Sequence, residues 1–193
     1  MLRTAAMKQA QVLSEKDIKR VLSAIAKRSY STRDRAMFLL TLLAGMRVGE
    51  VSALKVSDVY EDDGRVNDQI VLKKHQTKGS EARVVLLNTQ VQEELHVYGR
   101  TFSRKGDEPM FVSKWGKQIS PNSLVQVFGR FYKQAGLSNA TSHSGRRSFC
   151  TKLCEAGTSI HIVAALAGHR HISTTAVYLT ANPNIMRKAV ELA

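Results

Sequence analysis

The sequence lacks the features that mark several large classes of protein. Its 12 glycines and 3 prolines in 193 residues are too few for a collagen-like chain or a Pro/Gly-rich disordered one, and 43% of its residues are hydrophobic. A membrane-spanning helix needs roughly 20 consecutive apolar residues. The longest apolar run, residues 36–46, is shorter and contains Thr41. The first residues also lack the apolar segment and the cleavage pattern of a secretory signal.

Cysteine is scarce as well. The two cysteines, Cys150 and Cys154, lie four residues apart in a helical pattern, a spacing that favours reduced thiols over a disulfide framework. Because His161, His169 and His171 follow closely, a zinc site has to be weighed against this interpretation. The spacing matches no common zinc motif. We therefore expect no bound metal and a cytoplasmic protein.

Acidic residues are few relative to basic ones. The 16 Asp and Glu face 29 Lys and Arg, which leaves a net charge of +13 and a pI near 10.0. The excess lies in residues 1–50 and 109–193, which carry the patterns of folded structure, whereas residues 51–108 are nearly balanced. A folded domain this basic most often binds nucleic acid. An anionic membrane surface is the weaker alternative, because no basic amphipathic anchor stands out.

The periodicity of apolar residues predicts a mainly α fold with one small antiparallel β-sheet inserted, an α+β class. Two β-rich runs, residues 69–73 and 82–87, flank a polar stretch around Gly79 and predict a hairpin. Helices are expected at residues 14–28, 32–45, 47–54, 89–104, 120–136, 144–156, 159–167 and 182–192. We expect residues 1–13 to be an N-terminal extension and residues 14–193 to form a single domain.

A few polar residues stand beside apolar elements and could carry chemistry. Arg47 follows the most apolar helix across a glycine, and Glu50 lies three residues further, on the same helical face. Spacing alone favours a simpler interpretation, an Arg–Glu pair that ties a helix end to the surface. His143 and Arg146 are three residues apart at a predicted helix start, where both could face one anion. Spacing alone does not separate Arg146 from the adjacent Arg147.

Taken together, five segments resemble the tyrosine recombinase (phage integrase) family. They are GMRVGE at 45–50, TKG at 77–79 before RVVL at 83–86, HSGRRSF at 143–149, LAGH at 166–169 and ISTTAVY at 172–178. Each segment alone is weak, but five in this order are specific. The resemblance implies the catalytic-domain fold of that family and DNA strand exchange through a 3′-phosphotyrosyl link.

The resemblance also implies a set of catalytic residues. They are Arg47, Lys78, His143, Arg146, His169 and Tyr178. In this interpretation Tyr178 is the nucleophile, the two arginines stabilise charge on the phosphate, and Lys78 protonates the leaving 5′-oxygen. His143 takes the tyrosine proton, His169 bonds the phosphate, and Glu50 orients Arg47 or His143. Lys73 and Lys74 are rivals of Lys78. Because the covalent link conserves the phosphodiester energy, neither ATP nor a metal cofactor is required.

The sequence departs from the family pattern in two places. The third box more often reads His-x-Leu-Arg-His, so that Gly145 and Arg147 are atypical. Most members also carry an N-terminal helical core-binding domain that closes around DNA, and this chain resembles a short form without it. The partners implied are double-stranded DNA, further copies of the chain in a tetramer that could exchange the segment 182–193, and an accessory DNA-binding protein.

Two other activities remain open from the sequence. The same phosphotyrosyl chemistry would serve a type IB topoisomerase, although the boxes resemble recombinases more closely. A DNA-binding regulator without catalysis would explain the missing clamp, but it would not need a tyrosine at position 178. We expect the enzyme to be nucleoid-associated. Its target site, and a phage, plasmid, transposon or promoter-switch setting, cannot be read from the chain.

Overall fold

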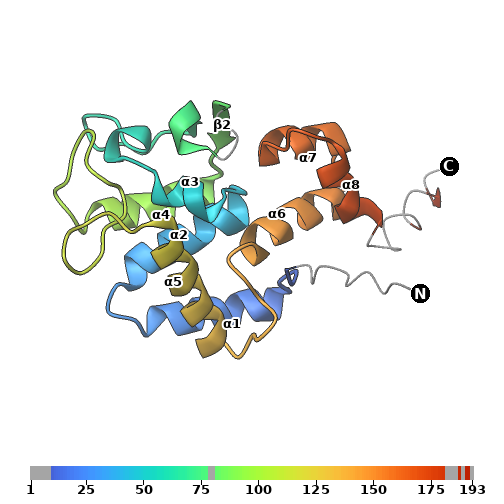
Figure 1. The fold of residues 1–193 in the computed structure, drawn as a ribbon, viewed down its shortest axis with the longest axis horizontal. Helices are drawn as coiled ribbons and strands as arrows, with labels where there is room; N and C mark the ends of the chain where they lie inside the picture. The colour runs from blue at the N-terminus through green and yellow to red at the C-terminus, as the bar shows by residue number, and fades with distance from the viewer. Residues whose placement is uncertain (1–9, 78–80, 181–186, 188–189, 192–193) are drawn as a thin grey trace.

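A computed structural model describes residues 10–77, 81–180, 187 and 190–191. Within these residues helices dominate, and the prediction of a mainly α fold with a small antiparallel sheet is confirmed (Figure 1). The α-helices are α1 (Glu15–Ala26), α2 (Ser31–Leu43), α3 (Val48–Ser52), α4 (Thr89–Gly99), α5 (Pro121–Gln134), α6 (Ser144–Glu155), α7 (Ile160–Ala167) and α8 (Ser173–Thr180). Two single-turn 3₁₀ helices occupy Val56–Asp58 and Lys74–Gln76. None of the helices in the described segments has the length and apolarity needed to cross a bilayer.

The sheet is a single hairpin of β1 (Gln69–Leu72) and β2 (Arg83–Leu86). The strands pair antiparallel, with Ile70 opposite Val85 and Leu72 opposite Arg83. Alternate side chains therefore point inward, and Ile70, Leu72 and Val85 are buried. Arg83 shares this inward face, which brings a guanidinium toward the interior.

The helix expected at residues 89–104 is shorter than its pattern predicts. α4 ends at Gly99, where an added Cβ would stand 2.9 Å from the Tyr60 ring. Beyond it the chain turns so that the Phe102 ring packs on Tyr98, with centroids 4.9 Å apart. Tertiary packing of these aromatic rings thus overrides the local helical propensity.

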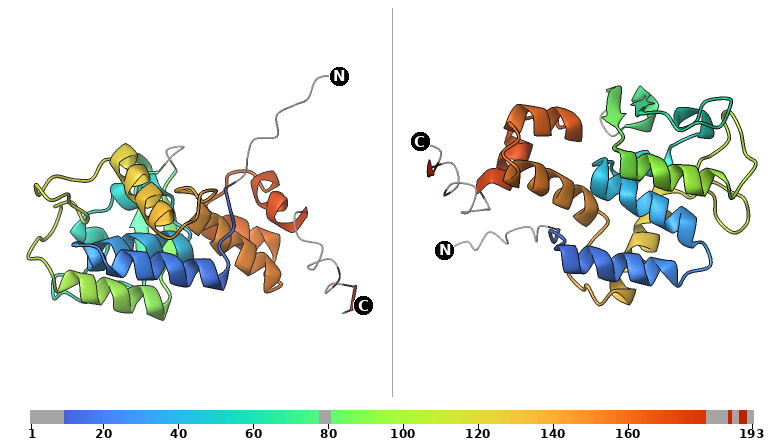
Figure 2. Two further views of the ribbon diagram at one scale, coloured as in Figure 1. Left: turned by 90° about the horizontal axis from the view of Figure 1, so that it is seen from below. Right: turned by 180° about the vertical axis from the view of Figure 1, so that it is seen from behind.

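Two apolar clusters of unequal size support the fold. The larger one draws on α1 to α5 and the hairpin, with α2 at its centre. The smaller one contains Cys150, Cys154, Val163 and Ala167 from α6 and α7. In Figures 1 and 2, α6 leads from the larger body to α7 and α8 at one end.

The first turn of α6 packs directly on α2. A Cβ added to Gly145 would stand 2.3 Å from Thr41 Oγ1, so the two helices approach more closely than a larger residue allows. This contact explains the atypical glycine in the third box.

Candidate active site

The site is built around the buried carboxylate of Glu50 in α3. Gly45 turns the chain out of α2 with φ +64°, and Arg47 then stands at the N-cap of α3. Glu50 accepts hydrogen bonds from the Arg47 backbone N–H at 2.8 Å and from its Nη1 at 2.7 Å. The Glu50 side chain is 1% exposed, against 25% for Arg47. Glu50 is therefore buried while Arg47 keeps contact with solvent, whereas both members of a surface ion pair would be exposed.

A second arginine, Arg83 of β2, bonds the same carboxylate. Its Nη2 lies 2.7 Å from one Glu50 oxygen and its Nε 3.2 Å from the other. Burial by itself would raise the pKa of Glu50, but bonds and charge from Arg83 and then Arg47 outweigh it and hold the pKa below its ordinary value. No role for Arg83 was predicted from the sequence. The signal that could have indicated one is the position of a charged residue two before Val85, on the same inward face of the predicted strand.

A third arginine, Arg146 in the first turn of α6, completes the cluster. It is 6% exposed, and its Nη1 donates to the Gly45 carbonyl at 2.6 Å. Burial, followed by repulsion from Arg47, lowers the pKa of Arg146 to about 10, so the guanidinium stays charged at neutral pH. Arg146 bonds the carbonyl of Gly45, two residues before Arg47, and the charge of Arg47 acts on it, so the structure brings the two arginines close together.

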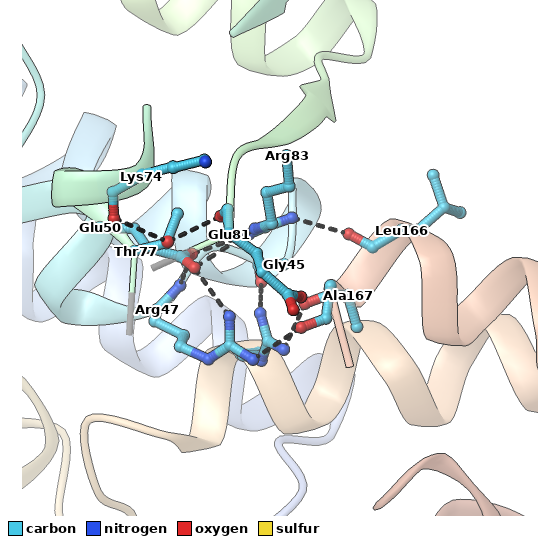
Figure 3. Close-up of polar contacts among 11 residues, drawn as sticks. Gly45, Arg47, Glu50, Lys74, Thr77, Glu81, Arg83, Leu166 and Ala167 are labelled. Atoms are coloured by element: carbon cyan, nitrogen blue, oxygen red, sulfur yellow. Dashed lines mark hydrogen bonds and ion pairs between the residues drawn. The ribbon is translucent and has the colours of Figure 1, made fainter. Parts of the chain in front are cut away.

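The C-terminal end of α7 joins all three arginines (Figure 3). Arg83 donates to the Leu166 carbonyl at 3.0 Å, Arg146 donates to that of Ala167, and Arg47 donates to that of Gly168 at 2.9 Å. A helix leaves its last carbonyls without intrahelical partners, and its dipole favours cations there. Three guanidinium groups from three different elements fill this role.

Gly168 makes that arrangement possible. It ends α7 in the left-handed conformation at φ +61°, as its place after the apolar run predicted. A Cβ at this position would stand 2.4 Å from Arg83 Cδ. The glycine therefore provides both the turn and the space for the arginine stem.

His169 follows directly and faces the nucleophile candidate. Its Nδ1 lies 2.8 Å from Thr175 Oγ1, and its ring stacks on Tyr178 with centroids 6.2 Å apart. Burial and the charges of Arg146, Arg47 and Arg83 lower the pKa of His169 to about 4. The imidazole is accordingly neutral at physiological pH.

Tyr178, in α8, packs against the smaller apolar cluster. That cluster includes Cys150, which lies one helical turn after Arg146. Burial and then Cys150 raise the pKa of Tyr178, while Arg146 and Arg147 act in the opposite direction. Arg147, the atypical residue of the third box, has its guanidinium carbon 5.9 Å from the Tyr178 ring centroid. The phenol therefore lies beside the arginine cluster.

The remaining catalytic candidates are His143 and Lys78. His143 is the N-cap of α6 and is exposed, one turn before Arg146. Lys78 and most of the predicted helix 182–192 lie outside the described residues. The described residues on either side of Lys78 are linked, because the Thr77 hydroxyl donates to the Glu81 carbonyl at 2.7 Å (Figure 3).

The two lysines that rival Lys78 lie at the surface, and the candidate metal ligands form no metal site in the described residues. Lys73 and Lys74 are exposed. Both cysteines are free and buried, and no three potential metal ligands gather within the part of the chain that the structure describes.

Comparisons with known proteins identify the family of the chain and several relatives. The model of the phage integrase family matches residues 11–184. Tyrosine recombinase XerA of Pyrococcus horikoshii is 31% identical over 185 residues, which cover 94% of this chain and 60% of that protein. The TnP I resolvase of Bacillus thuringiensis is 30% identical, covering 92% of this chain and 60% of that protein. The chain thus spans about 60% of the length of these curated relatives.

Solved structures share the fold. The crystal structure of XerA recombinase superposes with a TM-score of 0.77 at 25% identity, over 95% of this chain and 65% of that one. XerH recombinase, in a post-cleavage complex with palindromic difH substrate, superposes with a TM-score of 0.73 at 23% identity, over 98% of this chain and 55% of that one.

Proposed function

The chain belongs to the phage integrase family, and from that premise we propose that residues 14–193 act as the catalytic domain of a site-specific DNA recombinase. The observation that carries the proposal is the convergence of Arg47 and Arg146 on one turn beside Tyr178. A cluster of guanidinium groups with a single buried carboxylate suits a polyanionic substrate. The basic net charge of +13 is consistent with double-stranded DNA as that substrate.

The two arginines act on the scissile phosphate. Negative charge builds on the non-bridging oxygens in the transition state, and planar guanidinium groups fit two such oxygens better than lysine does. The guanidinium groups of Arg47 and Arg146 each donate to a backbone carbonyl, and each has further N–H donors for the phosphate. Preorganised donors of this kind lower the barrier without reorganisation during the reaction.

Tyr178 is the nucleophile. Its oxygen forms a bond to phosphorus while the bond from phosphorus to the 5′-oxygen breaks, and the electron pair leaves with that oxygen. Lys78 donates a proton to the leaving 5′-oxygen, which becomes a hydroxyl, and His143 accepts the phenolic proton. Neutral His169 donates a hydrogen bond to the phosphate, and Glu50 orients Arg47. Attack by a second 5′-hydroxyl reverses the step and joins the strands.

The assembly on DNA is part of the same proposal. Strand exchange needs two cleaved duplexes, so we infer that four copies act together at the nucleoid. The segment 182–193 would pass between neighbouring copies. An accessory DNA-binding partner would help to hold the duplex around the catalytic domain.

A nicked suicide substrate tests the function directly. A nick close to the cleavage site releases a short fragment after cleavage, so the covalent adduct accumulates. We would incubate the protein with nicked duplexes of random sequence and recover the denaturant-resistant adducts. Wild type should form adducts, Tyr178→Phe should form none, and Tyr30→Phe, a change at an exposed tyrosine, should behave as wild type.

Other outcomes would assign a different function. Equal adducts from Tyr178→Phe would show that the nucleophile is another residue. Relaxation of supercoiled plasmid without sequence preference or recombinant product would indicate a type IB topoisomerase. Salt-dependent DNA binding without any adduct would indicate a regulator that does not cleave.

A further inference from the structure

Arg83 is directed into the protein rather than toward a ligand. Its Nε and Nη2 bond Glu50, its Nη1 bonds the Leu166 carbonyl, and its side chain is 10% exposed. All three of its nitrogens therefore have protein partners. Arg47, with 25% of its side chain exposed, keeps an open side.

The partners of Arg83 are the groups that hold the other two arginines. Glu50 fixes Arg47 through both its backbone N–H and its Nη1. The last turn of α7, to which Arg83 is bonded, supplies the carbonyl groups of Ala167 and Gly168 that accept from Arg146 and Arg47. Arg83 thus spans from the carboxylate on α3 to the helix end that orients both guanidinium groups.

The three arginines together satisfy the C-terminal end of α7. The Ala164 and Ala165 carbonyls accept from the backbone N–H groups of His169 and Gly168, at 2.9 and 3.0 Å. The next three carbonyls accept from the arginines. Each arginine also bonds a group on the far side, either Glu50 or the Gly45 carbonyl. The end of α7 is therefore attached to the larger body by three parallel guanidinium bridges.

We propose that Arg83 is a positioning residue for strand cleavage: it fixes Glu50 and the end of α7 relative to each other, so that Arg47 and Arg146 address the same phosphate. The proposal rests on the function proposed above. Arg83 itself touches no substrate. Its contribution is to the geometry of two other guanidinium groups, and small displacements of such groups are costly in the transition state.

The charge-preserving variant Arg83→Lys separates position from charge. An ammonium group keeps the positive charge beside Glu50, but it cannot reproduce a planar fork that reaches two carboxylate oxygens and a carbonyl at once. Arg65→Lys is the matched control, because Arg65 is 80% exposed and pairs only with Asp63 among the ion pairs of the described residues. Both proteins carry the wild-type net charge.

Two substrates provide a readout that misfolding cannot imitate. One is the nicked duplex with an ordinary phosphodiester at the cleavage position mapped with wild type. The other carries a methylphosphonate there, in which a methyl group replaces one non-bridging oxygen and removes the negative charge. Guanidinium placement matters less for the neutral group. The ratio of the two single-turnover rates, measured at saturating protein on one preparation, does not depend on the folded fraction.

We expect Arg83→Lys to slow cleavage of the phosphodiester about 30-fold and of the methylphosphonate only about threefold. DNA affinity should stay within about threefold of wild type, because the net charge is unchanged. Arg65→Lys should match wild type on both substrates. Equal slowing on both substrates, or no slowing, would overturn the positioning role while leaving the proposed function intact. No adduct from wild type on either substrate would overturn the proposed function and this inference with it.

Discussion

The two sides of the candidate site are anchored very differently. Arg47, Glu50 and Arg83 lie on α3 and β2, whose buried apolar residues belong to the larger cluster. Tyr178 and His169 belong to the α6–α8 side, where the smaller cluster contains Cys150, Cys154, Val163 and Ala167. The groups that would stabilise charge are thus set in an extensive core, whereas the proposed nucleophile, Tyr178, packs on a small one. This division would suit a site in which the arginine charges stay in place while the phenol oxygen of Tyr178 approaches phosphorus.

The two sides meet through polar bonds as well as through the packing of α6 on α2. The arginine bridges run from Glu50 and the Gly45 carbonyl to the end of α7. The first turn of α6 adds the close contact between Gly145 and Thr41. The bridges and this contact are therefore the places where the comparison can be tested.

The largest effect is expected from Arg146→Lys. Arg146 bonds the Gly45 carbonyl on one side and the Ala167 carbonyl on the other, and it faces the phosphate in the proposed mechanism. Loss of its planar fork should slow single-turnover cleavage about 100- to 1000-fold, with DNA affinity nearly unchanged. Arg65→Lys again serves as the control. A rate within threefold of wild type would mean that the junction between the two sides is not part of the catalytic site.

A smaller effect, on stability, is expected at the contact between α6 and α2. Gly145→Ala would place a Cβ 2.3 Å from Thr41 Oγ1, whose hydroxyl already donates to the Phe38 carbonyl. The overpacking should lower the free energy of unfolding by about 1–3 kcal/mol. The matched variant is Gly129→Ala in α5, where no atom lies within 4 Å of an added Cβ.

The control variant should change stability in the opposite direction. Alanine favours a helix over glycine by up to about 1 kcal/mol, so Gly129→Ala should raise the free energy of unfolding. Urea titrations of both variants measure the two signs. If the two variants shifted stability in the same direction, the close approach of α6 to α2 would not be a constraint.

The smallest effect concerns His169 and pH. Its pKa is lowered to about 4 in the folded protein, against 6.5 for the free group, so between these values the unfolded chain binds the extra proton. The free energy of unfolding should therefore fall as the pH drops from about 6.5 to about 4. Because the residue is partly exposed, we expect a contribution of about 1 kcal/mol that is lost in this window.

The measurement compares wild type with His169→Gln. Urea unfolding at pH 7 and at pH 4.5 should show a loss for wild type that exceeds the loss for the variant. An identical pH dependence would mean that neither burial nor the three arginine charges lower the pKa of this imidazole. The nucleophile side would then be electrostatically separate from the arginine side.

Much of this arrangement could be predicted because its signals are local. Ser14 and Asp17 form the reciprocal hydrogen bonds of a capping box at the start of α1, where the sequence predicted a helix from residue 14. Gly168 ends α7 in the left-handed conformation, which glycine adopts without steric cost, directly after the predicted helix 159–167. The pair of Arg47 and Glu50 follows from helical spacing alone.

Other parts could not be predicted because no periodicity encodes them. The pattern of β2 indicates that Arg83 points inward, but not that it meets Glu50 and the Leu166 carbonyl. The packing of Tyr178 on the cluster that contains Cys150 likewise joins α8 to the middle of α6. Such contacts depend on how whole elements pack.

The sequence by itself determined the hairpin, most of the helices, the basic charge and the chemical types of the site residues, because capping, periodicity and charge act over a few neighbouring residues. It did not determine the end of α4 at Gly99 or the helix α8. Only the tertiary structure decided that three arginines from α3, β2 and α6 share the end of one helix. The physical reason is that the unsatisfied carbonyls at residues 166–168 and the buried Glu50 carboxylate must find donors, and those donors come from segments up to 121 positions away along the chain.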